Sequence, residues 1–220
     1  MLRNVKTAAI LTAILSSPAF AETGDMSIGV GGGLTQGMGL ELSYELNQNI
    51  DLRGIYYKGS MSQSELIDDI NFETSIEANT PGVMVDFFPT EGRSFRLTAG
   101  IVMNGNELNA KATPAGTYDI GGSTYLGSEV GSLNATVDFQ DVAPYVGMGY
   151  NLVSTENFAL GIEGGVLFQG SPKVTMTADG TSANDPAFQA ELEAERKKAE
   201  DELSDFEYLP VAKITLSYRF

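Results

Sequence analysis

Apolar and polar residues alternate along several stretches of the chain, and the last of these, residues 208–220, shows the pattern most clearly. Its apolar positions fall on one set of alternate residues: Tyr208, Ala212, Ile214, Leu216, Tyr218 and Phe220. The positions between them include Lys213, Thr215, Ser217 and Arg219. Because successive side chains of a strand point to opposite faces, this alternation predicts a β-strand with one apolar and one polar face.

Seven further stretches have the same character, and they bring the number of predicted strands to eight. They cover residues 26–33, 37–46, 50–61, 72–88, 94–104, about 134–152 and 158–170. The first connection, at 34–36, is short. After it, short connections at 47–49, 89–93 and 153–157 alternate with mostly longer ones at 62–71, 105–133 and 172–207. Membrane-spanning barrels alternate short turns at one rim with longer loops at the other. The pattern therefore predicts an all-β fold, an eight-stranded antiparallel transmembrane β-barrel with long outer loops.

The last long connection carries a helical pattern. Asp185 can cap a helix that has Pro186 at its first position. Apolar residues then recur at helical spacing: Phe188, Leu192, Ala199, Leu203 and Phe206. We therefore expect this outer loop to be partly helical, over residues 184–205. Whether the helix lies over the barrel mouth or is a solvated loop helix stays open.

The first residues have the features of a secretory signal peptide. Arg3 and Lys6 precede an apolar run that ends before the small-residue cleavage site Ala19-Phe20-Ala21. We therefore expect residues 1–21 to be removed and residues 22–220 to form the barrel domain; a membrane anchor is the alternative for this segment. No later segment approaches the ~18–20 uninterrupted apolar residues that a spanning helix needs.

Composition and charge narrow the chemistry. The chain has no histidine and no cysteine. The missing histidine excludes His-dependent acyl transfer and metal sites with His ligands, and the missing cysteine excludes a disulfide framework. The adjacent acids Asp68 and Asp69 suit a solvated loop better than a catalytic pair. A formal net charge of −16 argues against nucleic acid as a partner. We therefore expect no enzymatic activity, no metal and no cofactor.

The polar faces of the predicted strands carry four acids and four bases. If the apolar faces point to lipid, the inward residues include Glu41, Glu45, Asp86, Glu163, Arg53, Arg96, Lys213 and Arg219. An eight-stranded barrel is about wide enough inside for its own side chains, and a buried charge without a partner is costly. Opposite charges should therefore pair in this candidate lumen charge network. Two interpretations stay open, a charged plug that stabilises the barrel and a narrow polar path through it.

The end of the chain resembles the C-terminal strand of Gram-negative outer-membrane β-barrels, because it stops on Phe220 with Tyr218 two residues earlier. The resemblance implies that Tyr218 and Phe220 are an assembly signal for the barrel-assembly machinery. It also implies a location in the outer membrane of a Gram-negative bacterium, in contact with outer-membrane lipid and lipopolysaccharide. The segment 172–207 carries ten acids against four bases, so the outer mouth should attract cations or divalent-bridged lipopolysaccharide.

Three short stretches are similar to landmarks of the CarO-type outer-membrane channel family: residues 143–150 (APYVGMGY), 168–174 (FQGSPKV) and 208–213 (YLPVAK). This is the family of the carbapenem-associated outer-membrane protein, also described as an ornithine-uptake porin. The resemblance covers mainly residues 117–220, and it implies a narrow channel for small solutes that resemble cationic amino acids. The alternative is a closed structural or interaction barrel whose outer loops contact lipopolysaccharide or other partners, which the balanced lumen charges favour.

Overall fold

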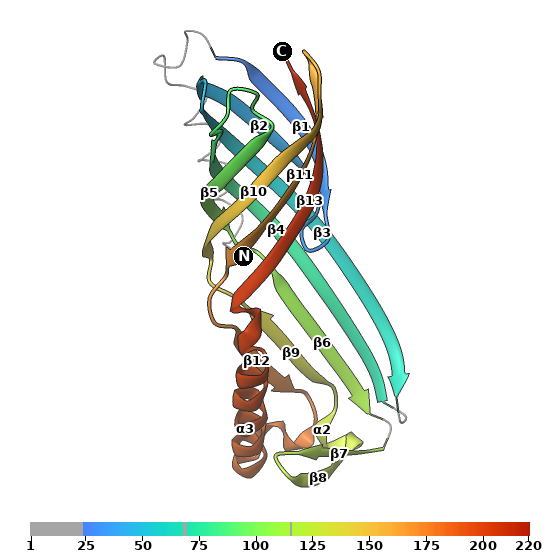
Figure 1. Ribbon diagram of the computed structural model, residues 1–220. Coiled ribbons are helices and arrows are strands. Elements are labelled where there is room, and N and C mark those ends of the chain that lie inside the picture. The colour runs from blue at the N-terminus through green and yellow to red at the C-terminus, as the bar shows by residue number, and fades with distance from the viewer. Residues whose placement is uncertain (1–23, 68–69, 115) are drawn as a thin grey trace, which may run out of the picture.

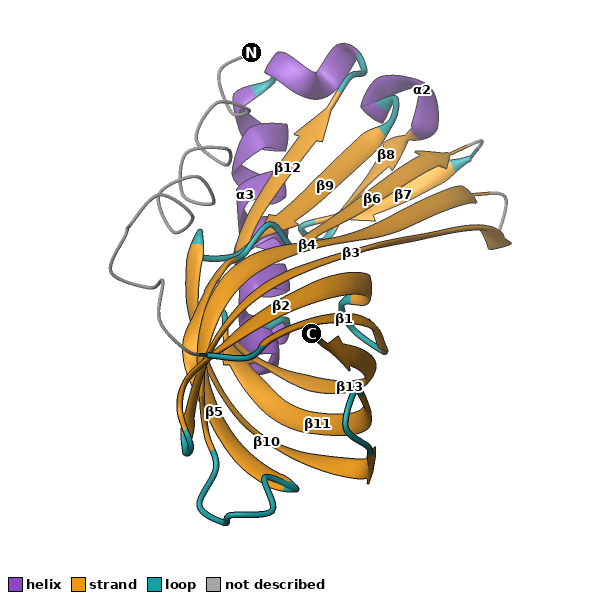
Figure 2. Ribbon diagram, turned by 90° about the horizontal axis from the view of Figure 1, so that it is seen from above, coloured by secondary structure: helices purple, strands orange, loops and turns teal. Residues whose placement is uncertain are grey.

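Eight antiparallel strands close into a barrel (Figures 1 and 2). The computed structural model describes residues 24–67, 70–114 and 116–220, so the expected signal peptide, residues 1–21, lies outside the described residues. In order around the barrel, the strands are β1 (Met26–Gly33), β2 (Gly37–Asn47), β3 (Ile50–Ile67), β4 (Ile70–Phe87), β5 (Phe95–Met103), β10 (Val142–Ser154), β11 (Phe158–Phe168) and β13 (Tyr208–Arg219). β13 pairs with β1, and β4 pairs with β5, which closes the ring. The predicted eight-stranded barrel is therefore confirmed.

The two ends of the barrel differ. Short connections join β2 to β3, β4 to β5 and β10 to β11 at one end, which we call the turn end and which also holds the C-terminus. The wall continues beyond the other end through three further strands: β6 (Glu107–Pro114), β9 (Leu133–Asp138) and β12 (Lys173–Ala178). With the outer parts of β3 and β4, residues 59–67 and 70–79, these form what we call the projecting sheet, and we call this end of the barrel the sheet end (Figure 1).

One long strand links the barrel to the projecting sheet. β4 pairs with β5 over Gly82–Phe87, within the barrel, and with β6 over Ile70–Glu77, beyond it. β6 then pairs with β9, and β9 with β12, which is the last strand of the sheet. Because β3 and β4 run unbroken through both parts, the projecting sheet is a direct extension of the barrel wall.

A small helical layer packs on the far strands of the projecting sheet. Its elements are the hairpin β7 (Thr117–Ile120) and β8 (Ser123–Leu126), the helices α2 (Gly127–Val130) and α3 (Pro186–Glu202), and the 3-10 helices η2 (Thr181–Asn184) and η3 (Ser204–Glu207). The Asp185 carboxylate caps α3 by accepting hydrogen bonds from the backbone N–H groups of Ala187 and Phe188, at 2.7 and 3.3 Å. Phe188 and Leu192 are buried with Ile120 and Val130 in a second apolar core. The expectation of a helical outer loop is therefore correct.

The hairpin is tied to α3 by hydrogen bonds as well as by this core. The hydroxyls of Ser123 and Tyr125 both donate to the Glu191 carboxylate at 2.6 Å. These bonds favour the ionised carboxylate and lower the pKa of Glu191. The same carboxylate raises the pKa of Tyr125 to about 12, because the phenol donates to it only when protonated.

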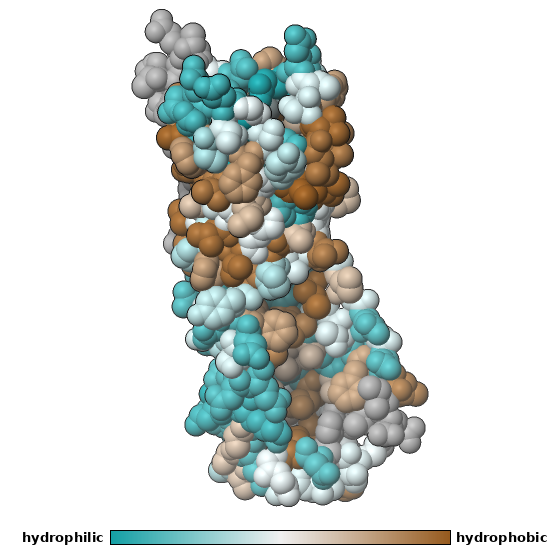
Figure 3. All heavy atoms as spheres, viewed as in Figure 1, coloured by the Kyte–Doolittle hydropathy of each residue, from teal (hydrophilic) through white to brown (hydrophobic). Residues whose placement is uncertain are grey.

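An apolar belt lies on the outer face of the barrel, and Figure 3 shows one side of it. Exposed apolar side chains on the outer face include Ile28, Val30, Leu40, Leu42, Val85, Phe87, Leu97, Ile101, Val146, Met148, Ile162, Ile214 and Leu216. Along the outward face of β3, Leu52 and Tyr56 give way to Ser60, Ser62 and Ser64. This change marks the boundary between a surface suited to lipid and a surface suited to water.

Three details of the strand assignment differ from the sequence prediction. The predicted strand at 134–152 is two strands, because the chain pairs with β6 as β9 and then, after residues 139–141, pairs with β5 as β10. The predicted strand at 50–61 continues to Ile67. β6 and β12 lie within segments that were expected to be loops, and both form ladders only as part of the projecting sheet.

Candidate functional site

Six charged side chains meet at the centre of the barrel, each from a different strand. They are Glu41 of β2, Arg53 of β3, Asp86 of β4, Arg96 of β5, Glu163 of β11 and Lys213 of β13. All six are buried, with exposed fractions between 2% and 9%. Three are acids and three are bases, so the buried cluster, which we call the central charge network, is formally neutral. All six belong to the candidate lumen set from the sequence.

Arg53 is the hub of the central charge network. Its Nη1 donates to Glu41 Oε2 at 2.9 Å, and its Nε donates to Asp86 Oδ2 at 2.7 Å. Its Nη2 donates to Asp86 Oδ1 at 2.9 Å and to Glu163 Oε2 at 2.8 Å. One guanidinium therefore contacts all three buried carboxylates, a role that its planar fork of donors suits better than a lysine ammonium.

The other two bases complete the pairing of each acid. Lys213 Nζ donates to Glu41 Oε1 at 2.6 Å and lies 3.2 Å from Glu163 Oε1. Arg96 Nη2 donates to Glu163 Oε2 at 2.6 Å, and its Nε lies 3.8 Å from Asp86 Oδ1. Each carboxylate thus contacts at least two bases. Such multiple contacts offset the desolvation of buried charges, which a single pair compensates poorly.

Strand register and glycines bring these long side chains together. Glu163 and Lys213 stand directly opposite each other on β11 and β13. Gly149, on the inward face of β10, leaves the space that Arg96 occupies, because a Cβ there would lie 2.8 Å from Arg96 Cζ. Gly165 similarly gives room to Tyr145, whose hydroxyl would lie 2.4 Å from an added Cβ. Small residues between the charged ones therefore let one barrel cross-section hold six long side chains.

A second buried layer lies between the central charge network and the sheet end. Tyr57 and Tyr145 point their hydroxyls at the network, donating to Glu41 Oε1 at 2.8 Å and to Glu163 Oε1 at 2.9 Å. Their rings pack with Ile55, Met84, Val102, Ala143, Leu167 and Val211. Tyr57, Val102, Ala143 and Leu167 have no exposed surface. The sequence prediction missed this apolar plug, because Tyr57 and Leu167 lie on the inward faces that it expected to be polar.

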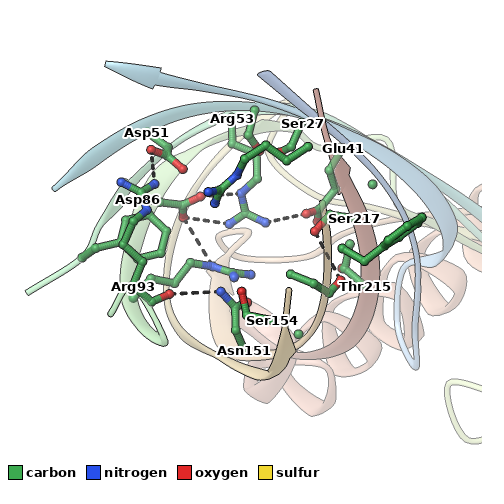
Figure 4. A pocket seen from close by; sticks show the side chains of 18 of the residues that line it. Ser27, Glu41, Asp51, Arg53, Asp86, Arg93, Asn151, Ser154, Thr215 and Ser217 are labelled. Carbon is green, nitrogen blue, oxygen red and sulfur yellow. Dashed lines mark hydrogen bonds and ion pairs between the residues drawn. The ribbon is translucent and has the colours of Figure 1, made fainter. Parts of the chain in front are cut away.

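On the turn-end side of the network the interior is hollow and lined mainly by polar side chains. A cavity of about 270 Å³ is lined by Arg53 and Arg96 and, nearer the rim, by polar side chains that include Asp51, Asn151 and Ser217 (Figure 4). Arg93 lies at its edge: it donates to Asp51 Oδ1 at 2.5 Å and stacks over the Phe88 ring, 4.0 Å from the ring centroid. Strand alternation could not point to Arg93, since this residue lies in a turn with a φ of 48°.

Two of the predicted lumen charges lie outside the central charge network. Glu45 is half-buried near the turn end, 3.6 Å from Arg93 Nη1. Arg219 lines the same cavity with a 43% exposed side chain and lies 4.0 Å from Asp25 Oδ2. Both point to the inner side of the wall, as expected, but they are too close to the rim to reach the central carboxylates.

Tyr218 and Phe220, the expected assembly signal, lie together at the turn end. Their rings make an edge-to-face contact with centroids 5.2 Å apart, and Phe220 is 70% exposed. Tyr218 also packs against Phe158 on the neighbouring strand, at 5.0 Å. These contacts fix the position of the two aromatic residues on the outer surface; their recognition by the assembly machinery stays a prediction.

Within the ranges that the structure describes, no three acidic side chains are arranged to hold a metal ion. No helix in those ranges is long and apolar enough to cross a membrane.

A closed antiparallel barrel with an apolar belt outside and paired charges inside is the architecture of membrane-spanning β-barrels, which satisfy every ladder hydrogen bond within the wall. This chain has that architecture.

Comparison with solved structures identifies similar barrels. CarO of Acinetobacter baumannii is similar at a TM-score of 0.59 and 18% sequence identity, over 88% of this chain and 97% of that one. CarO2 of the same organism gives a TM-score of 0.61 and 17% identity, over 90% of this chain and all of that one. Ail, the attachment invasion locus protein of Yersinia pestis, is more distant, with a TM-score of 0.38 and 14% identity. No protein-family model and no curated protein sequence matches the chain. The chain therefore has the fold of an eight-stranded outer-membrane β-barrel.

Proposed function

We propose that this protein is a closed interaction barrel of the Gram-negative outer membrane. In this proposal the barrel anchors the chain, and the projecting sheet with its helical layer is the working surface that meets partners outside the cell. The observation that carries the proposal is the filled interior, in which the central charge network and the apolar plug are stacked across the lumen. A barrel of eight strands has no spare width beside these side chains.

The orientation follows from the two ends. Outer-membrane barrels keep short turns on the periplasmic side and longer elements outside. The turn end would then face the periplasm, and the projecting sheet would stand outside the cell. The apolar belt would contact outer-membrane lipid. The polar surface that begins at Ser60 would lie among lipopolysaccharide head groups.

Opening a path through this interior would be costly. Any solute that separates Arg53 from its three carboxylates leaves buried charges without partners, and breaking one such pair costs about 3–5 kcal/mol. The apolar plug would have to move as well. These costs support a barrel that stays closed in the absence of a large rearrangement.

A channel for small cationic solutes is the second candidate. The specific observation in its favour is the cavity of about 270 Å³ at the turn end, whose lining extends inward to Arg53 and Arg96. The resemblance to CarO-type proteins points the same way. In this case the apolar plug around Leu167 would have to act as the gate.

Conductance of the purified full-length protein in a planar bilayer tests the proposal. We expect no resolvable single-channel steps from protein whose heat-modifiable migration shows a folded barrel. A Leu167→Gly variant, which empties part of the plug, serves as the comparison because it should leak more than the wild type. Stable cation-selective steps from the wild-type barrel would overturn the closed-barrel proposal in favour of the channel.

A further inference from the structure

The two edge strands of the projecting sheet differ in whether their free backbone groups are covered. At one edge, β12 is covered by α3, whose side chains bond to the backbone of Val174. The Val174 N–H donates to Glu200 Oε1 at 3.0 Å, and the Val174 carbonyl accepts from Arg196 Nη1 at 3.4 Å. Arg196 and Glu200 also form an ion pair with each other. This edge is thereby closed to pairing with another chain.

The opposite edge is open. The ladder between β2 and β3 ends at the pair Met38–Lys58, whereas β3 continues to Ile67 with only β4 beside it. Within the described residues, no hydrogen bond reaches the backbone of residues 59–66 from the open side. The side chains of residues 60–66 are exposed, Met61 and Leu66 by 70% each. At about 3.3 Å per residue, this open edge is roughly 25 Å long.

The direction of the free backbone groups follows from the register. The two-residue turn between Asn47 and Ile50 makes these residues a hydrogen-bonded pair. Because hydrogen-bonded pairs alternate along an antiparallel ladder, the even-numbered residues of β3 bond toward the β2 side. Beyond Lys58, the residues with this parity are Ser60, Ser62, Ser64 and Leu66. Their N–H and C=O groups point to the open side with no strand to meet them.

We propose that residues 59–66 of β3 bind an extended cationic polypeptide segment by strand addition. The open edge supplies the backbone donors and acceptors, and its small serine side chains allow a strand to approach closely. Charge selects the class of segment: the outer parts of β3 and β4 carry Glu65, Glu73 and Glu77, and in their described residues no base lies beyond Lys58. A lysine or arginine opposite Glu65 would form a favourable cross-strand pair.

A second copy of the chain fits this edge poorly. Copies inserted in one membrane all send β3 outward, whereas two identical edges that pair in an antiparallel ladder must run in opposite directions. Such a pair would also bring the acidic surfaces of both copies together, at a formal net charge of −16 each. The inference rests on the proposed interaction function, to which it adds the class of partner.

The test uses the full-length protein in lipid nanodiscs and a labelled synthetic peptide of alternating lysine and threonine, about eight residues long to match the open edge. Two matched control peptides have the same residues with every second backbone nitrogen methylated. One is methylated at the odd positions and the other at the even positions, so that only one of them loses the N–H groups that would pair with β3 (the pairing phase). Methylation removes backbone donors and keeps the charge. Fluorescence anisotropy measures affinity, and amide hydrogen exchange locates the peptide.

We expect the parent peptide to bind and to protect the amides of residues 59–66, and the methylated peptide of the pairing phase to bind at least about tenfold more weakly. Ser62→Pro, which removes one open-side donor on an edge strand that tolerates proline, should weaken binding by roughly tenfold. Ser62→Ala keeps the donor and should leave the affinity unchanged. If Ser62→Pro fails to fold, the methylated peptides decide the question.

Three results would overturn the assignment: no binding of the parent peptide, equal binding of the parent and both methylated peptides, or protection of residues 59–66 by a dimer in the absence of peptide. The second result would mean charge attraction alone, and the third would mean that a second copy occupies the edge. Conductance is measured separately. A barrel that conducts and still binds the peptide would refute the closed-barrel proposal alone, and a closed barrel without binding would refute the edge assignment alone.

Discussion

Glu163→Gln is the substitution that separates a charged plug from a wet path. The Glu163 carboxylate contacts Arg53 Nη2 at 2.8 Å, Arg96 Nη2 at 2.6 Å and Lys213 Nζ at 3.2 Å, and it accepts a hydrogen bond from Tyr145. Glutamine has the same shape without the charge. The central charge network would then hold three bases against two acids, in a layer whose members are at most 9% exposed.

The size of the effect follows from this burial. Breaking a buried pair by removing one partner costs about 3–5 kcal/mol, because the remaining charge stays desolvated. We expect the free energy of unfolding of the barrel in lipid vesicles, measured by guanidinium titration, to fall by about this amount. We expect no conductance to appear in a planar bilayer, since the amide fills the same space and the apolar plug around Leu167 is unchanged.

Two controls make the measurement decisive. Glu45→Gln is the same chemical change at a half-buried carboxylate, 3.6 Å from Arg93, and should cost no more than about 1 kcal/mol. Combining Glu163→Gln with Lys213→Met restores the balance of charge, so the double variant should be less destabilised than the sum of the two single ones. A stability loss below about 1 kcal/mol for Glu163→Gln, together with a new or altered current, would refute the plug and support a solvated path.

Three further outcomes are expected. Leu167→Ala should lower the free energy of unfolding by about 2–5 kcal/mol, measured by the same titration, because Leu167 is fully buried in the plug; an unchanged stability would contradict that packing. The chain has no cysteine, so single cysteines report topology: Asn184→Cys should react with an impermeant thiol reagent on intact cells and Gln48→Cys should not, and the opposite result would invert the barrel. Hairpin docking should depend on pH: Glu191, whose pKa is lowered, contributes above its unfolded pKa and stops contributing as pH falls through the lowered one. Tyr125 contributes below its unfolded pKa and stops contributing as pH rises toward its folded pKa of about 12. Amide exchange of residues 117–126 measures both limits, and constant protection across them would refute this docking.

Alternation in the sequence reports the face of a strand but not the depth along it. Glu163 and Glu45 both lie on inward faces, and the sequence ranks them equally. In the structure, Glu163 is 4% exposed in the central charge network, whereas Glu45 lies near the rim and pairs with Arg93. Depth depends on where each strand enters the barrel, and this is set by pairing with neighbours distant in sequence. The strand face of all eight candidate charges could therefore be predicted from the sequence. Which six of them meet at the centre of the barrel could not.

A local pattern of alternation also does not show which strand a segment will pair with. Residues 133–138 and 142–154 both alternate, and together they look like one long strand, yet β9 pairs with β6 and β10 pairs with β5. The break at 139–141 arises because the chain leaves one sheet and enters another. β6 and β12 are rich in small and polar residues, and they form ladders because β4 extends far enough to template β6.

The branch at β4 connects the filled interior to the open edge. β4 bonds to β5 within the apolar belt and to β6 beyond it, so residues 70–79 are continuous with the barrel wall. β3 follows β4 without a break over its whole length, so the open edge is held by a continuous ladder that begins in the barrel wall. A preformed, rigid strand loses little conformational entropy when a partner pairs with it. In the closed-barrel proposal the buried lumen charges are matched internally, so recognition falls to surfaces beyond the apolar belt, and the open edge of β3 offers unpaired backbone groups there.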